Sequence, residues 1–283
     1  MKQLLILSGK GGTGKTTVAS AFIEFSQAAA FADCDVDAPN LHLVLMQASS
    51  PVKTDYYGLG KAVIDPEACI HCGLCEEHCN FKAIQDLVVR EYACEGCGVC
   101  AQLCPTKAIT MQDYVSGDLM LYQNKRKVFS TAQLKMGSGN SGKLVTAVKK
   151  GLKDASGEAT LAIIDGSPGI GCPVLASISG VDFVLIVAEP SLSGMHDMKR
   201  IVETAQRLGA KCVVCINKFD VNPAIAAQIE QECKRVSVPV IGRIPYDQTV
   251  VEAVNACQSI AQYPDSKAGA AIASIWESLY HYI

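Results

Sequence analysis

The sequence predicts an α/β protein: a doubly wound, mostly parallel sheet that carries a small α+β insertion. Three observations lead to this fold class. A glycine-rich loop follows a short apolar run at the N-terminus, near-continuous apolar runs return in the second half, and a dense group of cysteines lies between them. Such apolar runs are typical of parallel strands that helices cover on both faces. We therefore expect residues 1–57 and 116–283 to build one sheet domain and residues 58–115 to form the insertion.

Composition limits the function classes. The 283 residues are 49% hydrophobic with a net charge of −3, which supports a full core but not the basic surface of a nucleic-acid-binding protein. The N-terminus does not resemble a signal peptide, and no apolar run reaches the ~18 residues of a membrane span. We therefore expect a cytoplasmic protein without a nucleic-acid partner. In reducing surroundings its 14 cysteines favour metal binding over disulfides.

The first predicted element is a strand over residues 3–7, followed directly by Ser8-Gly9-Lys10-Gly11-Gly12-Thr13-Gly14-Lys15-Thr16-Thr17. This loop fits the G-x-x-x-x-G-K-[ST] pattern, in which backbone N–H groups and a helix N-terminus surround nucleotide phosphates. A plain glycine-rich turn would not require the Lys-Thr pair at the helix start. The predicted nucleotide ligands are Gly11, Gly12, Thr13, Gly14, Lys15, Thr16 and Thr17, with Thr16 also binding Mg²⁺.

An acidic loop follows the second predicted strand. Apolar periodicity predicts a helix over residues 16–27 and a strand over residues 29–32. The strand ends in Asp33-Cys34-Asp35-Val36-Asp37, at the edge of an α/β sheet where ligands bind. Such a cluster also occurs in solvated turns. Beside a nucleotide, however, one carboxylate can orient the attacking water and another can approach Mg²⁺.

Lys10 completes the motif K-G-G-x-G-K-T, which resembles the deviant phosphate loop of the family that contains MinD, the Mrp-type iron–sulfur carriers and the nitrogenase iron protein. The resemblance implies an ATPase that forms an ATP-sandwich homodimer, in which Lys10 crosses the interface and touches the partner's nucleotide. It also implies that the acidic loop is switch I and that Asp35 orients the attacking water.

Eight cysteines form two similar runs, Cys69-x₂-Cys72-x₂-Cys75-x₃-Cys79 and Cys94-x₂-Cys97-x₂-Cys100-x₃-Cys104-Pro105. Bacterial two-cluster ferredoxins share this spacing, and there the fourth cysteine of each run binds the other cluster. Two zinc sites are the competing interpretation, but two complete blocks favour two [4Fe–4S] clusters. The predicted ligand sets are Cys69, Cys72, Cys75 and Cys104 for one cluster and Cys94, Cys97, Cys100 and Cys79 for the other.

The segments around the insertion are less regular. The composition of residues 46–60 predicts a polar connector. Alternation of side-chain character on either side of Gln123-Asn124-Lys125 predicts a hairpin over residues 118–129. Residues 137–143 are rich in Gly and Ser, which predicts a mobile linker before a helix over residues 143–152.

The nucleotide-binding pattern resumes with a strand over residues 161–164 that ends in Asp165-Gly166. This arrangement places the Asp165 carboxylate beside Mg²⁺ and allows the backbone N–H of Gly166 to bind the γ-phosphate. Residues 166–171 would then form switch II. Cys172 follows it, and in the nitrogenase iron protein a cysteine at the corresponding distance ligates a cluster shared between subunits. Cys172 is therefore a candidate metal ligand, although a small residue packed before a helix is the alternative.

Two more strands, residues 183–188 and 212–216, alternate with helices over residues 193–208 and 223–234. The pair Cys212-x₂-Cys215 lies in a strand, where positions i and i+3 face opposite sides, so we expect it to pack in the core. By resemblance to the family, Asn217 and Pro245 flank the adenine base. Residues 268–283 predict a terminal helix with few basic residues, so we expect no stable membrane association.

The whole chain resembles MinD/Mrp-type ATPases that carry a two-cluster ferredoxin domain, and is similar to the ATPases of the orange-protein complex. This implies ATP hydrolysis that gates cluster or electron delivery during iron–sulfur or mixed-metal cluster assembly, with a metalloprotein as acceptor. A nitrogenase-iron-protein-like electron donor to one redox partner is the alternative. A MinD-like positioning switch is a third possibility, which the cysteine insertion disfavours.

Overall fold

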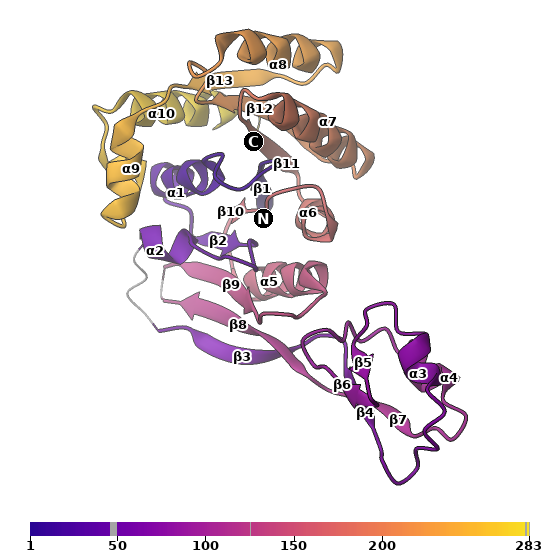
Figure 1. The fold of residues 1–283 in the computed structure, drawn as a ribbon. Coiled ribbons are helices and arrows are strands. Elements are labelled where there is room, and N and C mark those ends of the chain that lie inside the picture. Colours follow the sequence, from indigo (N-terminus) through magenta and orange to yellow (C-terminus); the bar gives the residue numbers. More distant parts are fainter. Residues whose placement is uncertain (46–49, 125, 281, 283) are drawn as a thin grey trace.

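The computed structural model describes residues 1–45, 50–124, 126–280 and 282. Residues 46–49 of the predicted connector, Lys125 of the predicted turn, and residues 281 and 283 of the predicted terminal helix lie outside the described residues. Figure 1 shows a large layered body from which a smaller unit projects at one end of the sheet.

A nine-stranded sheet runs through the large body in the order β13-β12-β11-β1-β10-β2-β9-β8-β3. Seven strands are parallel: β1 (Lys2–Leu7), β2 (Ala30–Asp33), β9 (Val128–Leu134), β10 (Leu161–Asp165), β11 (Phe183–Ala188), β12 (Lys211–Asn217) and β13 (Val240–Ile244). The strands β8 (Val115–Gln123) and β3 (Val52–Tyr57) extend the sheet in antiparallel fashion. The predicted mostly parallel α/β sheet is confirmed.

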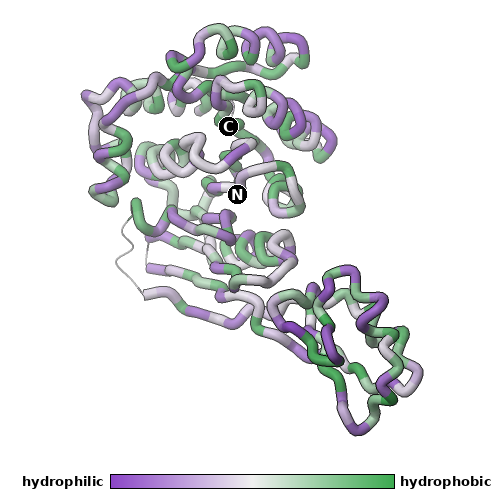
Figure 2. Tube along the Cα trace, viewed as in Figure 1, coloured by the Kyte–Doolittle hydropathy of each residue, from purple (hydrophilic) through white to green (hydrophobic). Residues whose placement is uncertain are grey.

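Helices cover both faces of this sheet. One face packs against α5 (Ser141–Ala155), α6 (Cys172–Ile178), α7 (Leu192–Arg207) and α8 (Pro223–Arg235). The other packs against α1 (Lys15–Ser26), α2 (Leu41–Leu45), α9 (Gln248–Asn255), the short 3₁₀ turn η1 (Ile260–Gln262) and α10 (Lys267–Tyr280). Successive side chains of a strand point to opposite faces, so Leu5 joins the first core and Leu4 the second. Figure 2 shows hydrophobic and hydrophilic segments alternating along the helices that cover the sheet.

The hairpin prediction is confirmed, because β8 and β9 pair in antiparallel register. The connector prediction is wrong for residues 52–57, which form the edge strand β3. Four successive side chains of β3 are exposed, Val52 to Asp55, so no alternation of apolar and polar residues marks the strand. Its backbone pairing with β8 places it in the sheet.

The segment between β3 and β8 builds its own small unit. In it β4 (Lys61–Ile64) pairs with β7 (Ile109–Gln112), and β5 (Ile84–Gln85) pairs with β6 (Val88–Val89). Two short helices, α3 (Leu74–Glu77) and α4 (Val99–Leu103), complete it. Its buried core consists of Ala62, Cys75, Ala83, Ile84, Cys94 and Ile109. We refer to this segment, residues 58–114, as the insert.

The end of the chain packs back on the sheet. Trp276 of α10 lies 5.0 Å from Phe22 of α1, measured between ring centroids, and the buried side chains of α10 include Ile272, Ile275 and Leu279. The predicted terminal helix is therefore present over the described residues of this region and packs against α1. Among the described residues, no helix combines the length and the apolar character that crossing a membrane requires.

Candidate functional site

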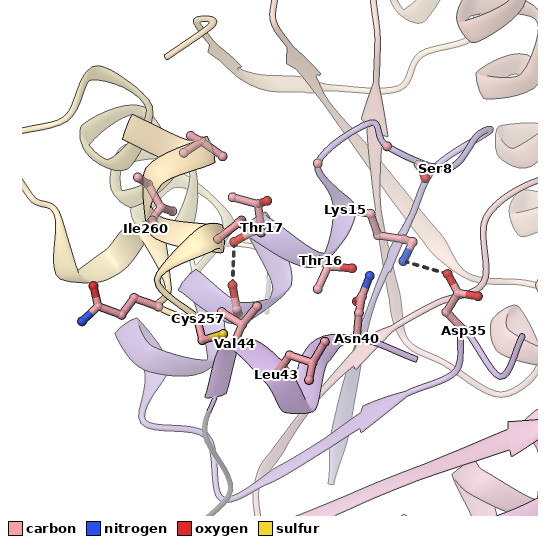
Figure 3. Close-up of a pocket in the computed structure, with 18 of the residues that line it drawn as sticks. Ser8, Lys15, Thr16, Thr17, Asp35, Asn40, Leu43, Val44, Cys257 and Ile260 are labelled. Atoms are coloured by element: carbon pink, nitrogen blue, oxygen red, sulfur yellow. Dashed lines mark hydrogen bonds and ion pairs between the residues drawn. The ribbon is translucent and has the colours of Figure 1, made fainter. Parts of the chain in front are cut away.

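The phosphate loop joins β1 to α1. Gly12 and Gly14 have φ angles of 76° and 92°, in a region that glycine adopts without a steric penalty. Because α1 begins at Lys15, the N–H groups of its first turn lack helical partners and face the loop. A pocket lined by Lys10, Gly11, Gly12, Gly14, Lys15, Thr16, Thr17, Asp35 and Asn40 opens here. Figure 3 shows Lys15 and Asp35 on one side of it and α2 and Cys257 on the other.

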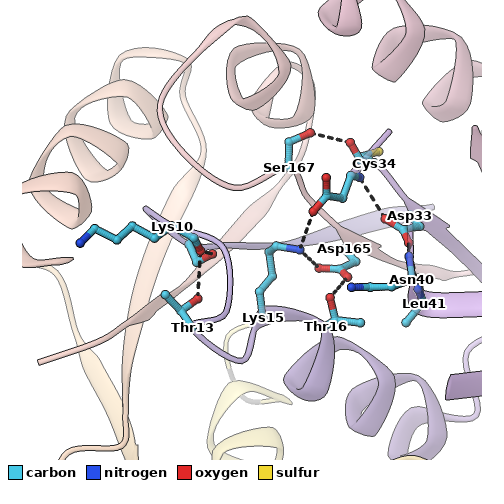
Figure 4. Close-up of polar contacts among 12 residues, drawn as sticks. Lys10, Thr13, Lys15, Thr16, Asp33, Cys34, Asn40, Leu41, Asp165 and Ser167 are labelled. Atoms are coloured by element: carbon cyan, nitrogen blue, oxygen red, sulfur yellow. Dashed lines mark hydrogen bonds and ion pairs between the residues drawn. The ribbon is translucent and has the colours of Figure 1, made fainter. Parts of the chain in front are cut away.

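Lys15, Thr16 and Asp165 form the centre of the site. Lys15 Nζ lies 2.8 Å from Asp165 Oδ1, and Thr16 Oγ1 donates to Asp165 Oδ2 at 2.6 Å. Asp165 is completely buried at the end of β10. Burial disfavours the charged form of Lys15, but the carboxylates of Asp165, Asp33 and Asp35 outweigh it and raise the pKa of Lys15. The raised pKa favours the charged form of the lysine beside the loop (Figure 4).

Asp35 faces the same lysine. Its Oδ2 lies 3.9 Å from Lys15 Nζ, and its side chain lines the phosphate-loop pocket. Burial raises the pKa of Asp35, and Lys15 partly opposes this rise. A carboxylate whose pKa is raised is a better proton acceptor than an exposed one. The structure thus brings Lys15, Thr16, Asp35 and Asp165 together from three strand ends.

Asp33 shapes the acidic loop, a role that the sequence analysis did not assign. Its carboxylate accepts backbone N–H groups of Asp35, Asn40 and Leu41 at 2.9, 2.9 and 3.0 Å. Burial, with the nearby Asp165 carboxylate, raises the pKa of Asp33 to about 7. Its place as the last residue of a buried strand was the available signal, because a polar side chain there must find partners inside the fold.

Ser167 links the two predicted switch segments and was also missed. Its Oγ donates to the Cys34 carbonyl, and the Cys34 N–H donates to the Asp165 carbonyl at 2.7 Å. Cys34, which precedes Asp35, is therefore held at both its N–H and its carbonyl by residues 165–167. No spacing pattern in the sequence predicts a contact between side chain and backbone over 133 positions.

Lys10 lies on the surface, and its Nζ contacts Ser193 Oγ at the start of α7. Figure 4 shows the Lys10 side chain directed away from Lys15. Within one chain Lys10 therefore takes no part in the Lys15 centre. This geometry leaves the predicted contact with a partner's nucleotide untested.

Asn217 and Pro245 line a second hollow beside the phosphate loop, together with Gly12, Gly14, Lys218, Tyr246 and Val250. Asn217 Nδ2 donates to the Thr13 carbonyl at 2.6 Å, and its Oδ1 accepts the Lys218 N–H at 2.9 Å. One amide hydrogen of Asn217 remains for a ligand. In the structure Asn217, the last residue of β12, therefore stabilises the phosphate loop through its bond to Thr13.

The eight cysteines of the insert gather in two groups of four. One hollow is lined by Cys79, Cys94, Cys97 and Cys100. Another is lined by Cys69, Cys72, Cys75 and Cys104. These are the two sets that the sequence analysis derived from the crossed arrangement. We call the first the inner hollow and the second the outer hollow.

Backbone geometry around the hollows suits thiolate ligands. The N–H groups of Ala83 and Ala108 donate to the sulfurs of Cys79 and Cys104, each at 3.3 Å. Among the described residues, no three His, Cys, Asp or Glu side chains are close enough to hold a single metal ion.

The remaining cysteines are outside these hollows. Cys172 is exposed in the first turn of α6. Cys212 and Cys215 join opposite cores, as expected for positions i and i+3 of a strand, and burial raises their pKa values to about 11 and 12. Such thiols stay protonated and pack as small apolar groups.

Comparison with known proteins agrees with this geometry. A family model described as "CobQ/CobB/MinD/ParA nucleotide binding domain" matches residues 4–260. The uncharacterized protein MJ0578 of Methanocaldococcus jannaschii is 31% identical over 99% of this chain and 97% of its own length. The uncharacterized ATP-binding protein MJ0547 of the same organism is 26% identical over 96% of this chain and 85% of its own length.

Solved structures share the fold. The cell division ATPase MinD of Pyrococcus furiosus superposes with a TM-score of 0.59 at 17% identity, covering 100% of this chain and 99% of MinD. An ATP complex of McdA from Cyanothece also has a TM-score of 0.59, at 20% identity, covering 99% of this chain and 96% of McdA. At these identities the likeness concerns the fold alone.

Proposed function

The chain belongs to the CobQ/CobB/MinD/ParA nucleotide-binding family, and from this we propose that it is a Mg²⁺-dependent ATPase whose nucleotide-gated homodimer controls cluster or electron delivery to a metalloprotein. ATP binding is the family's common property, and the McdA structure is an ATP complex by its title. The observation that carries the iron–sulfur part is the grouping of eight cysteines into two hollows of four.

The ATPase roles follow from the geometry of the site. Lys15 and the N–H groups at the start of α1 would bind phosphate oxygens, and Thr16 with Asp165 would bind Mg²⁺. Asp35 would hold the attacking water, because Asp33 and Ser167 position its backbone from two sides. Lys10 lies exposed, where it could reach the nucleotide of a second chain. Asn217 and Pro245 would border the base.

The insert would hold two [4Fe–4S] clusters, one on Cys79, Cys94, Cys97 and Cys100 and one on Cys69, Cys72, Cys75 and Cys104. Such clusters carry single electrons at potentials that hydrogen bonds to their sulfurs adjust. The N–H groups of Ala83 and Ala108 are positioned for this. The same fit supports our proposal that residues 58–115 are a ferredoxin domain placed within an ATPase domain of residues 1–57 and 116–283.

Electron delivery without transfer of a cluster is a second candidate function. Cys75 and Cys94 are only 9% and 8% exposed. A cluster bound through buried cysteines would be a resident group rather than a cargo, because its release would require opening the core of the insert. Cys172, which is exposed beside switch II, remains the candidate for a transferable or intersubunit site.

A positioning function like that of the cell division protein MinD is less well supported. The apolar side chains Ile272, Ile275 and Leu279 of α10 face the core, so they are not available to bind a surface. The cysteine hollows would also have no role in such a protein.

The deciding experiment is iron and sulfide analysis with EPR on anaerobically prepared protein, with and without MgATP. We expect at least eight iron atoms per chain, the content of two [4Fe–4S] clusters, and EPR signals that respond to MgATP. Protein that binds zinc or no metal after anaerobic reconstitution would refute the iron–sulfur proposal. The Cys172→Ala variant tests a further site, with Cys257→Ala as the control because Cys257 is also exposed. Iron lost only in Cys172→Ala would favour cluster delivery, whereas unchanged iron would favour electron delivery.

A further inference from the structure

One segment touches switch I, the helix that follows switch II, and the insert. It runs from Gln133 to Gly142, from the end of β9 to the first turn of α5, and we call it the connecting segment. The sequence analysis predicted residues 137–143 to be a mobile linker. In the structure the segment makes contacts on three sides.

Its first contact is with switch I. The Leu134 N–H donates to the Val36 carbonyl at 2.8 Å, and Gln133 Nε2 donates to the Asp37 carbonyl at 3.3 Å. Val36 directly follows Asp35, so a shift of the acidic loop must either move β9 or break the Leu134 hydrogen bond.

Its second contact is with the helix that begins where switch II ends. A Cβ atom on Gly142 would lie 3.2 Å from the Cys172 carbonyl oxygen, so α5 and α6 approach closely at their N-termini. Farther along α5, Lys149 Nζ donates to the carbonyls of Ser177 and Ser179 at 2.7 and 2.6 Å. The lysine thereby fastens the C-terminal end of α6 to α5. The two helices are joined at both ends and should move together.

Its third contact is with the insert, on both sides of Cys94. Gly137 has a φ of 71°, and a Cβ there would lie 3.0 Å from the Tyr92 carbonyl oxygen. Gly139 lies against the Glu95 carboxylate. Within the insert, Lys61 Nζ donates to the Cys94 carbonyl. Cys94 lines the inner hollow, so the connecting segment lies directly against the loop that forms this hollow.

The outer hollow is farther from the sheet. Ala62 of β4 lines the inner hollow and Ile64, two residues farther along the strand, lines the outer one. On the return strand β7, Ile109 lines the outer hollow and Met111 the inner one. Figure 1 shows the insert projecting away from the end of β8. The two cysteine sites therefore lie in series along the insert, with the Cys94 site next to the ATPase body.

We propose that the connecting segment transmits the nucleotide state to the inner cysteine site and that the outer site does not respond. The inference rests on the proposed function only in taking the group bound by the cysteines to be an iron–sulfur cluster. The structural path is switch I and α6, then the connecting segment, then residues 92–95. ATP binding that moves the switches would change the packing around Cys94 while leaving Cys69, Cys72 and Cys75 unaffected.

Hydrogen–deuterium exchange on the full chain tests this proposal, with and without a non-hydrolysable ATP analogue and Mg²⁺. We expect the analogue to slow or speed exchange in residues 90–97 by at least about threefold and to leave residues 70–77 unchanged. An equal response in both segments, or none in residues 90–97, would overturn the proposal. Iron analysis of the same samples tests the proposed function separately. Exchange in residues 90–97 can be measured whether or not clusters bind.

Variants locate the path. Gly137→Val should abolish the response of residues 90–97, since a side chain there strains the backbone and pushes against Tyr92. Gly157→Val is the matched control, because Gly157 also has a positive φ, 53°, but no atom would meet its Cβ within 4 Å. If Gly137→Val folds poorly, Lys149→Met interrupts the same path at another point, because it removes the hydrogen bonds between α5 and α6. A full response in both Gly137→Val and Lys149→Met would show that the connecting segment is not the route.

Discussion

The sheet of the ATPase body completely buries large side chains such as Phe22, Leu4 and Ile163, whereas the core of the insert is small and includes the cysteines Cys75 and Cys94. The body therefore has enough apolar surface to fold by itself. We expect the insert, in contrast, to depend on a bound metal, because its core is small and small units commonly gain stability from metals or disulfides. The difference suggests that one half of this chain binds its ligand with a preformed site, and that the other half depends on its ligand for structure.

The two sites also differ in whether their charges are balanced before a ligand binds. In the body, the cation of Lys15 offsets part of the negative charge of Asp33, Asp35 and Asp165 inside a fixed frame. In the insert, eight thiols surround two hollows, and deprotonated thiols would repel one another without a metal to bind them. Four predictions follow this comparison from the largest expected effect to the smallest.

Removal of metal should have the largest effect and should be confined to the insert. After anaerobic chelation we expect amide protection in residues 58–114 to fall by about 100-fold or more, because metal binding and folding are coupled in small domains. Protection of β1 and β10 should remain, since their side chains pack between two helical layers. Hydrogen exchange measures both regions at once. Persistent protection of the insert would show that it folds without metal and would remove the contrast between the two halves.

The substitution Lys15→Ala should abolish ATP hydrolysis while leaving the insert intact. Loss of the buried cation beside Asp165 removes charge stabilisation at the phosphates, for which we expect a decrease of at least about 100-fold in turnover. Iron and sulfide content should not change. Lys153→Ala on α5 is the control for a general effect of removing a lysine. Loss of iron in Lys15→Ala would mean that the two halves are not separable.

The substitution Lys10→Ala should retain nucleotide binding and reduce hydrolysis by about 10- to 100-fold, if Lys10 stabilises charge across a dimer. Ser193→Ala removes only the contact that Lys10 makes within its own chain, so it should have little effect. Equilibrium binding and turnover are measured separately on both variants. Equal losses of turnover in the two variants would instead assign Lys10 a role within one chain.

The pH dependence of stability should show the smallest effect. Burial raises the pKa of Asp33 to about 7 from 3.8, so folded Asp33 keeps a proton that the unfolded chain releases. Its contribution to the free energy of unfolding is present below about pH 4 and is lost as the pH rises through about 7. The slope should be below about 1.4 kcal/mol per pH unit.

Urea unfolding at pH 5 and pH 8 measures this change. Asp33→Asn should reduce the fall in the free energy of unfolding between pH 5 and pH 8. Asp37→Asn, at an exposed position of the same loop, should leave this fall unchanged. A stability that rises between these pH values in the wild type and not in Asp33→Asn would contradict the raised pKa.

Much of the fold could be predicted because the relevant signals are local. Apolar runs mark β10, β11 and β12, and the glycine loop marks the junction of β1 and α1. The edge strand β3 could not be predicted, because its exposed side chains carry no pattern and only its pairing with β8 defines it. The helix α9 was missed as well, although it supplies Val250 to both hollows beside the phosphate loop.

The sequence by itself determined the residue types and spacings that depend on neighbours along the chain: the phosphate loop, the strand-terminal Asp35 and Asp165 regions, and the two cysteine runs with their crossed fourth members. Tertiary structure alone decided the contacts between distant segments. These are the brace of Asp33, the link from Ser167 to Cys34, the contact of Lys10 with Ser193, and the position of the connecting segment against Cys94. The physical reason is that such contacts depend on how strands are ordered in the sheet, and strand order does not follow the order of the chain.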